Sequence, residues 1–423
     1  MIEGNRSFVQ RKKTKAGVVR QFNDLVFSRR LGSTLEMRGF AGNGFIQHLN
    51  EVGFADIKVH GEDGSSPRYP VTGAEDYCPS ARTPGHRSQS PRERFMEQNS
   101  AYSEKFDIEL SKFQNLEKVH ALPEIFHYWS NKYVRPKLRT LGFDSIAEFF
   151  VRYISQSCNR RKEDISKIVS LGSGNSDFEV DFARRLCESG TNNFHFVCLE
   201  MNGSMLQRGK TLAADSGLSN HFSFMECDLN NWTAEHEFDS ILAIHSLHHV
   251  VALEKLFDEV HRSLSDEGAF LINDMIGRNG HLRWPEALEV VQAFWKELPH
   301  SKKYNHQLKR FEDEFVNWDC STEGFEGIRA QDILPELIKR FEFDAFVGFA
   351  NVIDIFVGRS FGHNFDPKNE SDLAFIDRVA MTDEALIESG KVKPTGMTAA
   401  LKKQGATVKT YKHLTPEFCV RWP

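Results

Sequence analysis

The chain has 423 residues, of which 40% are hydrophobic and 26% are charged, and its formal net charge is −6. This length allows one large domain with extensions or two ordinary domains, and the composition is that of a globular protein. The chain has no bulk excess of positive charge that would indicate nucleic acid, no apolar run that could span a bilayer, and no apolar segment of a signal peptide near Met1. The sequence therefore predicts a cytoplasmic protein that binds no membrane, and it disfavours nucleic acid as a partner, with a local basic patch left open.

The seven cysteines are scattered along the chain and include no C-x-x-C pair. This pattern indicates neither a disulfide framework nor a zinc cluster. We expect most of these cysteines to be small core residues or surface bystanders.

Residues 1–100 are predicted to form an N-terminal extension with a linker or mobile segment. Residues 1–35 are locally basic, with an RKK and an RR run, which favours a solvated leader over an arm that binds RNA. Residues 44–60 predict a short helix, a glycine break and a strand. Residues 80–95 are rich in Ser, Pro and Arg and lack core positions, which indicates the linker.

Three further regions follow along the chain. Residues 101–160 have a helical pattern with aromatic clusters, and we expect them to form a helical cap. Residues 161–365 alternate apolar strands with amphipathic helices, as βαβ units do. Residues 366–423 carry one helix, DLAFIDRVAMTDEALIES, and an irregular end, which predicts a helical C-terminal tail.

A glycine-rich turn follows the first strand of the α/β region. The segment IVSLGSGNSDFE runs from apolar residues into Gly172 and Gly174 and then into the start of a helix. Glycine lets backbone N–H groups approach a ligand closely, and the positive end of a helix favours an anion. The turn therefore suits a nucleotide, without indicating which one.

The later strands also end in polar residues. FHFVCLE ends in Glu200, FSFME is followed by Cys227 and Asp228, FDSILAI by HSLHH from His245, and AFLIN by Asp274. In an open parallel sheet, ligands bind outside the carboxyl ends of the strands. The Glu200 carboxylate can accept two hydrogen bonds from a ribose diol, and Asp228 can accept one from an exocyclic adenine amine. Together these strand ends describe an adenosine site.

Five motifs stand in a fixed order over residues 167–276: VSLGSGNSDFE, VCLEMNGSML, FMECDLNNW, FDSILAIHSLHHV and LSDEGAFLINDM. With these motifs the chain resembles the class I S-adenosylmethionine-dependent methyltransferases. The resemblance implies an α/β three-layer sandwich with a mostly parallel seven-stranded sheet and helical additions at both ends. It also implies S-adenosylmethionine as the methyl donor.

The resemblance further implies which residues bind the donor. Gly172 and Gly174 would border its methionine part, Glu200 would bind the ribose hydroxyls, Asp228 would bind the adenine amine, and His245 would lie near the sulfonium. The full set of predicted donor-binding residues is Ser170, Gly172, Ser173, Gly174, Glu200, Met201, Asp228, Leu229 and His245.

Two positions depart from the family pattern. Ser170 stands where the family often has an acid, two residues before the first glycine, and Ser176 stands where a third glycine is usual. The missing acid would anchor the amino group of the donor. Asp177 or Glu179 is the candidate substitute.

A nucleotide-dependent oxidoreductase on a similar sheet is the main alternative enzyme. Its fingerprint has a third glycine three residues after the second and an acid about 20 residues on. In this chain Asp177 stands where the third glycine is required. Glu200 lies 28 residues beyond Gly172, farther than the acid of the fingerprint, so the spacing disfavours a dinucleotide. A scaffold protein that keeps the turn without catalysis is a second alternative.

The motif HSLHH and the strand end after it supply the catalytic candidates, which are His248, His249 and Asp274. Methyl transfer needs alignment and exclusion of water, and a hydroxyl acceptor benefits from a general base. The alternatives are a structural role for the histidines and a polar cap for Asp274. His245 and His249 are four residues apart, but no third ligand follows in an obvious motif, so no metal site is predicted.

The acceptor is expected to be selected by parts outside the sheet. Two aromatic-rich stretches, 121–150 and 278–330, are candidates for a lid, although ordinary packing accounts for most of their aromatic residues. A pocket lined by aromatic residues of these stretches, together with the negative net charge of the chain, favours a small-molecule or carbohydrate-type acceptor over a folded RNA. An RNA methyltransferase, which would need the basic leader, is the alternative. O-, N- and C-methylation all stay open, and no oligomeric state is predicted.

Overall fold

The structure is a computed structural model, and it divides the chain into two compact units, Met1–Ser88 and Gln89–Pro423. The first unit is described only for three short strands, β1 (Val26–Arg29), β2 (Leu35–Arg38) and β3 (Ile57–His60). β1 pairs antiparallel with β2, and β2 pairs parallel with β3. The strand expected within 44–60 is present as β3, whereas the short helix expected in the same range and the linker predicted at 80–95 lie outside the described residues. The second unit is described for residues 102–111, 122–162, 164–322 and 324–422.

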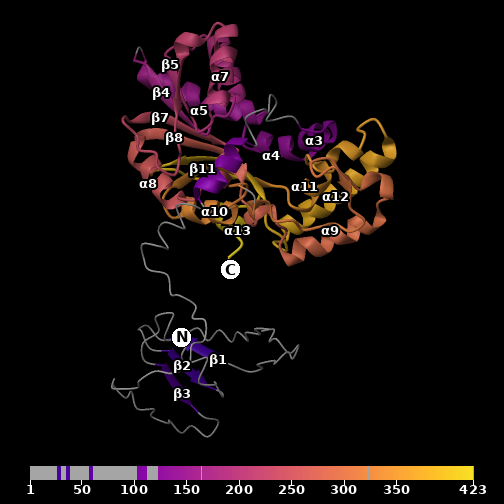
Figure 1. Ribbon diagram of the computed structural model, residues 1–423. Helices are drawn as coiled ribbons and strands as arrows, with labels where there is room; N and C mark the ends of the chain where they lie inside the picture. The colour runs from indigo at the N-terminus through magenta and orange to yellow at the C-terminus, as the bar shows by residue number, and fades with distance from the viewer. Residues whose placement is uncertain are drawn as a thin grey trace, which may run out of the picture. The chain divides into compact units, whose positions relative to one another are not determined.

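An eight-stranded sheet forms the centre of the second unit (Figure 1). The strand order is β13-β11-β12-β8-β7-β4-β5-β6. β4 to β8 are mutually parallel, whereas β12 runs antiparallel to both of its neighbours, β8 and β11. The strands are β4 (Ser166–Leu171), β5 (Phe194–Glu200), β6 (Phe222–Glu226), β7 (Phe238–Ile244), β8 (Leu264–Met275), β11 (Glu342–Phe349), β12 (Gly396–Lys402) and β13 (Lys409–Thr410).

The predicted fold class is confirmed by this sheet. Seven of its strands give the mostly parallel arrangement of a class I methyltransferase, with one antiparallel strand. The eighth, β13, is a two-residue strand that pairs with β11 at the edge. The strand order reverses beside β4, which has β5 on one side and β7 on the other, and this reversal is the point at which open α/β sheets bind ligands.

Helices cover both faces of the sheet, because successive strand residues point to opposite faces. Ile168 packs in one buried cluster with α5, α6 and α7, whereas its neighbour Val169 packs in the other with α8 and α10. Figure 1 shows α5 and α7 on one side of the strands and α8 and α10 on the other. The helices are α3 (Glu124–Trp129), α4 (Arg135–Thr140), α5 (Ile146–Arg161), α6 (Asp177–Glu188), α7 (Gly203–Asp215), α8 (Leu253–Ser263), α9 (Pro285–Glu297), α10 (Ala330–Ile338), α11 (Val352–Val357), α12 (Glu370–Glu388) and α13 (Pro416–Cys419).

The C-terminal segment 366–423 differs from the predicted helical tail. Its expected helix is present as α12, but the same segment also supplies β12, which lies inside the sheet between β8 and β11. The first six residues of this strand, GMTAAL, are all buried. They are mostly small, begin with a glycine and come just after Pro394, so the sequence did not mark them as a strand. The proposed boundary at residue 365 therefore cuts through the sheet.

The cap region 101–160 contains a helix at residues 102–111, followed by α3, a π-helical turn, α4 and α5. Trp129 is only 1% exposed and belongs to the core, and the Tyr128 hydroxyl donates to the Asp377 carboxylate of α12 at 3.0 Å. These two aromatic residues therefore stabilise the packing instead of lining a pocket. Within the described part of the chain, no helix combines the length and hydropathy needed to cross a bilayer.

Candidate functional site

The glycine turn after β4 packs directly against the segment that follows β7. Gly172 and Gly174 have φ values of +71° and +56°, in the left-handed region that favours glycine. A Cβ atom added to Gly172 would lie 2.7 Å from the Cβ atom of Ser246. Gly172 is therefore required both by its backbone conformation and by this close approach.

Glu200, at the end of β5, closes against this turn. Its carboxylate accepts hydrogen bonds from the backbone N–H of Gly174 and of Asn202, both at 3.0 Å, one on each oxygen. The side chain is 9% exposed, and burial raises its pKa despite these bonds. Each carboxylate oxygen keeps further acceptor capacity. The Gly174–Glu200 hydrogen bond therefore brings the turn and the β5 acid together.

Asp228 follows β6 and is engaged by several donors. Its Oδ2 accepts from Asn231 Nδ2 and from the Tyr102 hydroxyl, both at 2.8 Å. Its Oδ1 accepts from the backbone N–H of Asn230 at 2.9 Å. Tyr102 belongs to the helix at 102–111 and was not predicted as a site residue, because no motif links it to a residue 126 positions away.

The helix at 102–111 lies across several strand ends. Besides the Tyr102 contact with Asp228, the Leu110 carbonyl accepts from Asn202 Nδ2 at 3.3 Å, next to Glu200. Glu109 accepts the backbone N–H of Phe325 at 3.1 Å and pairs with His249 Nδ1 at 2.6 Å. This helix therefore covers the carboxyl ends of β5, β6 and β7.

Ser170 and Glu179 meet beneath the turn. The Ser170 hydroxyl donates to Glu179 Oε1 at 2.5 Å, while Glu179 Oε2 is buried without a hydrogen-bond partner among the described residues. Burial raises the Glu179 pKa to about 7, because desolvation disfavours the charged form. Asp177, the other candidate for the missing acid, is exposed. Glu179 is therefore the acid that lies against Ser170.

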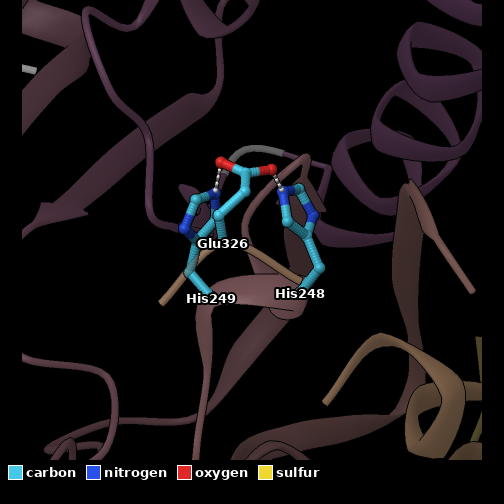
Figure 2. Close-up of side chains that lie close together, drawn as sticks. All are labelled: His248, His249 and Glu326. Carbon is cyan, nitrogen blue, oxygen red and sulfur yellow. Dashed lines mark ion pairs between the residues drawn. The ribbon is translucent and has the colours of Figure 1, made fainter. Parts of the chain in front are cut away.

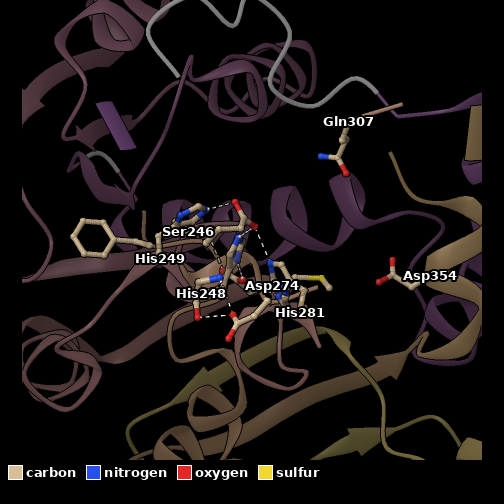
Figure 3. A network of polar contacts seen from close by, with 12 residues as sticks. Ser246, His248, His249, Asp274, His281, Gln307 and Asp354 are labelled. Atoms are coloured by element: carbon tan, nitrogen blue, oxygen red, sulfur yellow. Dashed lines mark hydrogen bonds and ion pairs between the residues drawn. The ribbon is translucent and has the colours of Figure 1, made fainter. Parts of the chain in front are cut away.

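His248, which follows β7, and Asp274, near the end of β8, form a buried pair (Figure 3). Asp274 Oδ1 lies 2.5 Å from His248 Nδ1, and Oδ2 accepts the backbone N–H groups of Ser246 and Leu247 at 2.9 and 2.8 Å. Burial alone would lower the His248 pKa, but Asp274 and Glu326 outweigh it and raise the pKa to about 10. Asp274 therefore fixes both the loop and the imidazole.

Glu326 lies between the two adjacent histidines, and Figure 2 shows one imidazole on each side of its carboxylate. Its Oε1 is 3.4 Å from His248 Nε2, and its Oε2 is 3.8 Å from His249 Nε2. His281 Nε2 approaches Oε1 at 2.7 Å. Nearby positive charge on the histidines outweighs burial and holds the Glu326 pKa well below its usual range. The sequence predicted His248 and His249 here but missed Glu326, Glu109 and His281, which come from distant segments.

His245 lies apart from this cluster although it belongs to the same motif. Its backbone is left-handed, with φ +52°, and its side chain is exposed. Its backbone N–H donates to the Asn273 carbonyl at 2.9 Å, and its Nε2 lies 3.0 Å from Asn273 Nδ2. The turn therefore directs His245 and His248 to different surroundings.

Comparison with known proteins identifies the family. Residues 162–335 match a family model described as a methyltransferase domain. The chain contains a class I methyltransferase domain.

The relatives of this methyltransferase domain are distant. The ubiquinone/menaquinone biosynthesis C-methyltransferase UbiE of Vibrio cholerae is 26% identical over 157 residues, and that of Brucella anthropi is 27% identical over 158 residues. Each match covers 37% of this chain and 57% of the relative, so the chain spans somewhat more than half the length of these proteins. Among solved structures, geranyl diphosphate C-methyltransferase from Streptomyces coelicolor A3(2) is similar with a TM-score of 0.36 and 12% identity, over 61% of this chain and 75% of that chain. A TM-score this low adds nothing to the fold described above.

The methyltransferase domain brings most of the predicted donor-binding residues to one edge of its sheet. Ser173 is buried, and its backbone N–H donates to the Leu199 carbonyl at 2.9 Å. A Cβ atom at Gly172 would lie 3.7 Å from a Leu229 methyl group, so Leu229 reaches the turn. Met201 follows Glu200 directly. These positions follow the ends of three neighbouring strands, β4, β5 and β6.

Replacement of Glu179 by Gln is expected to remove a pH-dependent loss of stability. In the parent, a folded pKa of about 7 lies above the ordinary value of 4.5, so the stability contributed by the neutral acid is complete below pH 4.5 and is lost as the pH rises through 7. Gln resembles the protonated acid and does not ionise. The free energy of unfolding of Glu179→Gln, relative to the parent, should therefore rise by about 3 kcal/mol between pH 4 and pH 8. Urea unfolding at several pH values measures this difference, and a difference that stays flat with pH would contradict the buried acid.

Proposed function

We propose that the methyltransferase domain binds S-adenosylmethionine and transfers its methyl group to a small-molecule acceptor. The observation that carries this proposal is the hydrogen bond between the Gly174 backbone N–H and the Glu200 carboxylate, at the point where the strand order reverses. It joins the glycine turn to a strand-end acid whose remaining lone pairs suit a ribose diol.

The residues around the turn fit the chemical groups of this donor. Glu200 offers acceptors for the ribose hydroxyls, and Asp228 offers an acceptor for the adenine amine. Glu179 lies against Ser170 and has a buried oxygen without a partner among the described residues, so we propose that it replaces the usual acid near the amino group of the donor. The donor-binding roles of Ser170, Ser173, Met201, Leu229 and His245 are proposed on the same basis of proximity to the turn.

When bound, S-adenosylmethionine supplies a methyl group on a positively charged sulfur, which becomes a neutral thioether after transfer. The tasks of the chain are to align the acceptor and to exclude water. We assign the alignment to His248, His249 and Asp274, because Asp274 binds the loop that packs on Gly172 and fixes the His248 ring. We assign the exclusion of water to the helix at 102–111, which covers the strand ends.

Removal of the Tyr102 hydroxyl is expected to tighten donor binding about 10- to 100-fold. This hydroxyl occupies Asp228 Oδ2 at 2.8 Å, so an adenine amine must compete with it for the same acceptor. A hydrogen bond to a charged acceptor is worth about 1.5–3 kcal/mol, which sets the magnitude. Calorimetric titration of Tyr102→Phe with S-adenosylmethionine measures the change. Tyr133→Phe is a matched control, because it removes a 2.9 Å bond from a tyrosine to Asp377 elsewhere in the chain. Weaker binding by Tyr102→Phe would instead make Tyr102 part of the donor site.

For the acceptor we propose a small molecule, in line with the UbiE proteins, which are named as acting in ubiquinone and menaquinone biosynthesis. The net charge of −6 supports this choice over RNA. The test is transfer of a labelled methyl group from S-adenosylmethionine to a panel of quinols, phenols and sugars, with structured RNA as a separate panel. Label on a small molecule is the expected result. Label on RNA alone, or on none of the panel while the donor is bound, would contradict the proposal.

The cytoplasm is the location that we propose. Five of the described cysteines, Cys158, Cys187, Cys198, Cys227 and Cys419, are free thiols. Unpaired cysteines in this number suit a reducing compartment.

A further inference from the structure

His248 and His249 each have a carboxylate next to the Nδ1 atom of the imidazole ring. His248 Nδ1 lies 2.5 Å from Asp274 Oδ1, and His249 Nδ1 lies 2.6 Å from Glu109 Oε1. Each Nδ1 therefore faces its own buried carboxylate, while both Nε2 atoms turn to the one carboxylate of Glu326 (Figure 2). Histidines that ligate a metal commonly have this arrangement, in which one nitrogen binds a carboxylate and the other binds the ion.

The spacing around Glu326 suits the ligands of one cation better than it suits hydrogen bonds. The separations from His248 Nε2 and His249 Nε2 to the Glu326 oxygens are 3.4 and 3.8 Å, beyond the 2.7–3.2 Å range of an ordinary N–H···O bond. Ligands bound at about 2.0–2.1 Å around a tetrahedral ion are about 3.3–3.4 Å apart. One ligand atom from each residue lies within 4.8 Å of the others. Small side-chain movements would therefore bring all three onto one ion.

We propose that His248, His249 and Glu326 bind one divalent transition-metal ion. Two imidazoles and a carboxylate are ligands for Zn²⁺, Mn²⁺ or Fe²⁺, whereas Mg²⁺ and Ca²⁺ prefer oxygen ligands. The sequence predicted no metal site because it contained no third ligand near the histidine motif. That ligand is Glu326, 77 residues beyond His249 and adjacent to it in space.

The surrounding residues support such an ion by orientation and by charge. Asp274 and Glu109 are 2% and 4% exposed, so both carboxylates are held in a protein interior that disfavours uncompensated negative charge. His281 Nε2, at 2.7 Å from Glu326 Oε1, holds the third carboxylate in place. A divalent cation would offset the excess of carboxylates at this position.

The site is open to solvent on one side, because the Glu326 side chain is 34% exposed and that of His249 is 22% exposed. An ion with three protein ligands keeps a coordination position for a water or a substrate oxygen. If the proposed function holds, this position would take an oxygen of the acceptor, since His248 follows the loop that packs on the glycine turn. This last step rests on the proposed function, whereas the metal site itself does not.

The test is calorimetric titration of the full chain, freed of metal by chelation, with Zn²⁺, Mn²⁺ and Co²⁺ in the absence of donor and acceptor. We expect one saturable site, no comparable binding of Mg²⁺, and a visible absorption band of bound Co²⁺ that reports nitrogen and oxygen ligands. His249→Ala and Glu326→Gln should each weaken binding at least 100-fold. Glu109→Gln, which removes only an orienting carboxylate, should weaken it about 10- to 100-fold.

Matched controls come from an exposed loop of the same chain. His236→Ala and Glu235→Gln remove the same kinds of group from exposed positions and should bind metal like the parent. Thermal unfolding without metal shows whether each variant folds. If His249→Ala is unstable, Glu326→Gln still tests the site, because Glu326 is partly exposed and its replacement disturbs the core less. No saturable binding by the parent, or unchanged binding by both His249→Ala and Glu326→Gln, would overturn the proposal. Because neither donor nor acceptor is present, failure here is distinct from failure of the proposed methyl transfer.

Discussion

Glu200→Gln is expected to weaken binding of S-adenosylmethionine about 10- to 100-fold. The Glu200 carboxylate already accepts the Gly174 and Asn202 backbone N–H groups, and its remaining acceptors would receive the ribose hydroxyls. Hydrogen bonds to a charged acceptor are worth about 1.5–3 kcal/mol each, so loss of the charge and of one acceptor oxygen gives a change of this size. Calorimetric titration of the variant against the parent measures it.

Glu226→Gln is the matched control for this prediction. Glu226 ends the neighbouring strand β6, in register with Glu200, but its side chain is exposed. It should bind the donor like the parent. Equal affinity of Glu200→Gln and the parent would mean that the adenosine is bound elsewhere.

The second large effect is expected for Asp274→Ala, which should lower the free energy of unfolding by about 3–5 kcal/mol. Asp274 accepts the backbone N–H groups of Ser246, Leu247 and Met275 and pairs with His248, all in a nearly solvent-free environment. The substitution leaves these donors buried without an acceptor, and each costs about 1–3 kcal/mol. Urea unfolding followed by circular dichroism is the measurement.

Asp266→Ala serves as the control for Asp274→Ala. Both acids belong to β8, but the Asp266 side chain is 87% exposed and lies 3.5 Å from Lys403. A surface pair of this kind contributes little, so the change should stay within about 0.5 kcal/mol. A loss for Asp274→Ala as small as that for Asp266→Ala would contradict the described network.

The sheet could be predicted from the sequence where the strands are apolar and their ends are polar. β4, β5, β7 and β8 each combine a buried apolar run with a following Gly, Glu, His or Asp, so both the strand and the strand end were marked. β12 could not be recognised in this way, since GMTAALK consists mostly of small residues and lacks an apolar run like those of the other strands. Its place between β8 and β11 depends on pairing with strands far away in the chain.

The candidate site could be predicted only for residues that follow the strands. Glu200, Asp228, His248 and Asp274 lie next to strand ends and were found, whereas Tyr102 contacts Asp228 across 126 residues. Glu326 and Glu109 likewise reach the histidines from a distant loop and from the covering helix. Nothing local marks such residues, because only the folded chain brings them together.

The most direct test of the account is calorimetric titration of the purified parent protein with S-adenosylmethionine and S-adenosylhomocysteine, with NAD as the control ligand. The glycine turn, Glu200 and Asp228 together predict binding of both sulfur nucleosides at one site with a micromolar dissociation constant, and no binding of NAD. Binding of NAD in their place, or no binding of either sulfur nucleoside, would contradict the proposal that this turn holds a methyl donor.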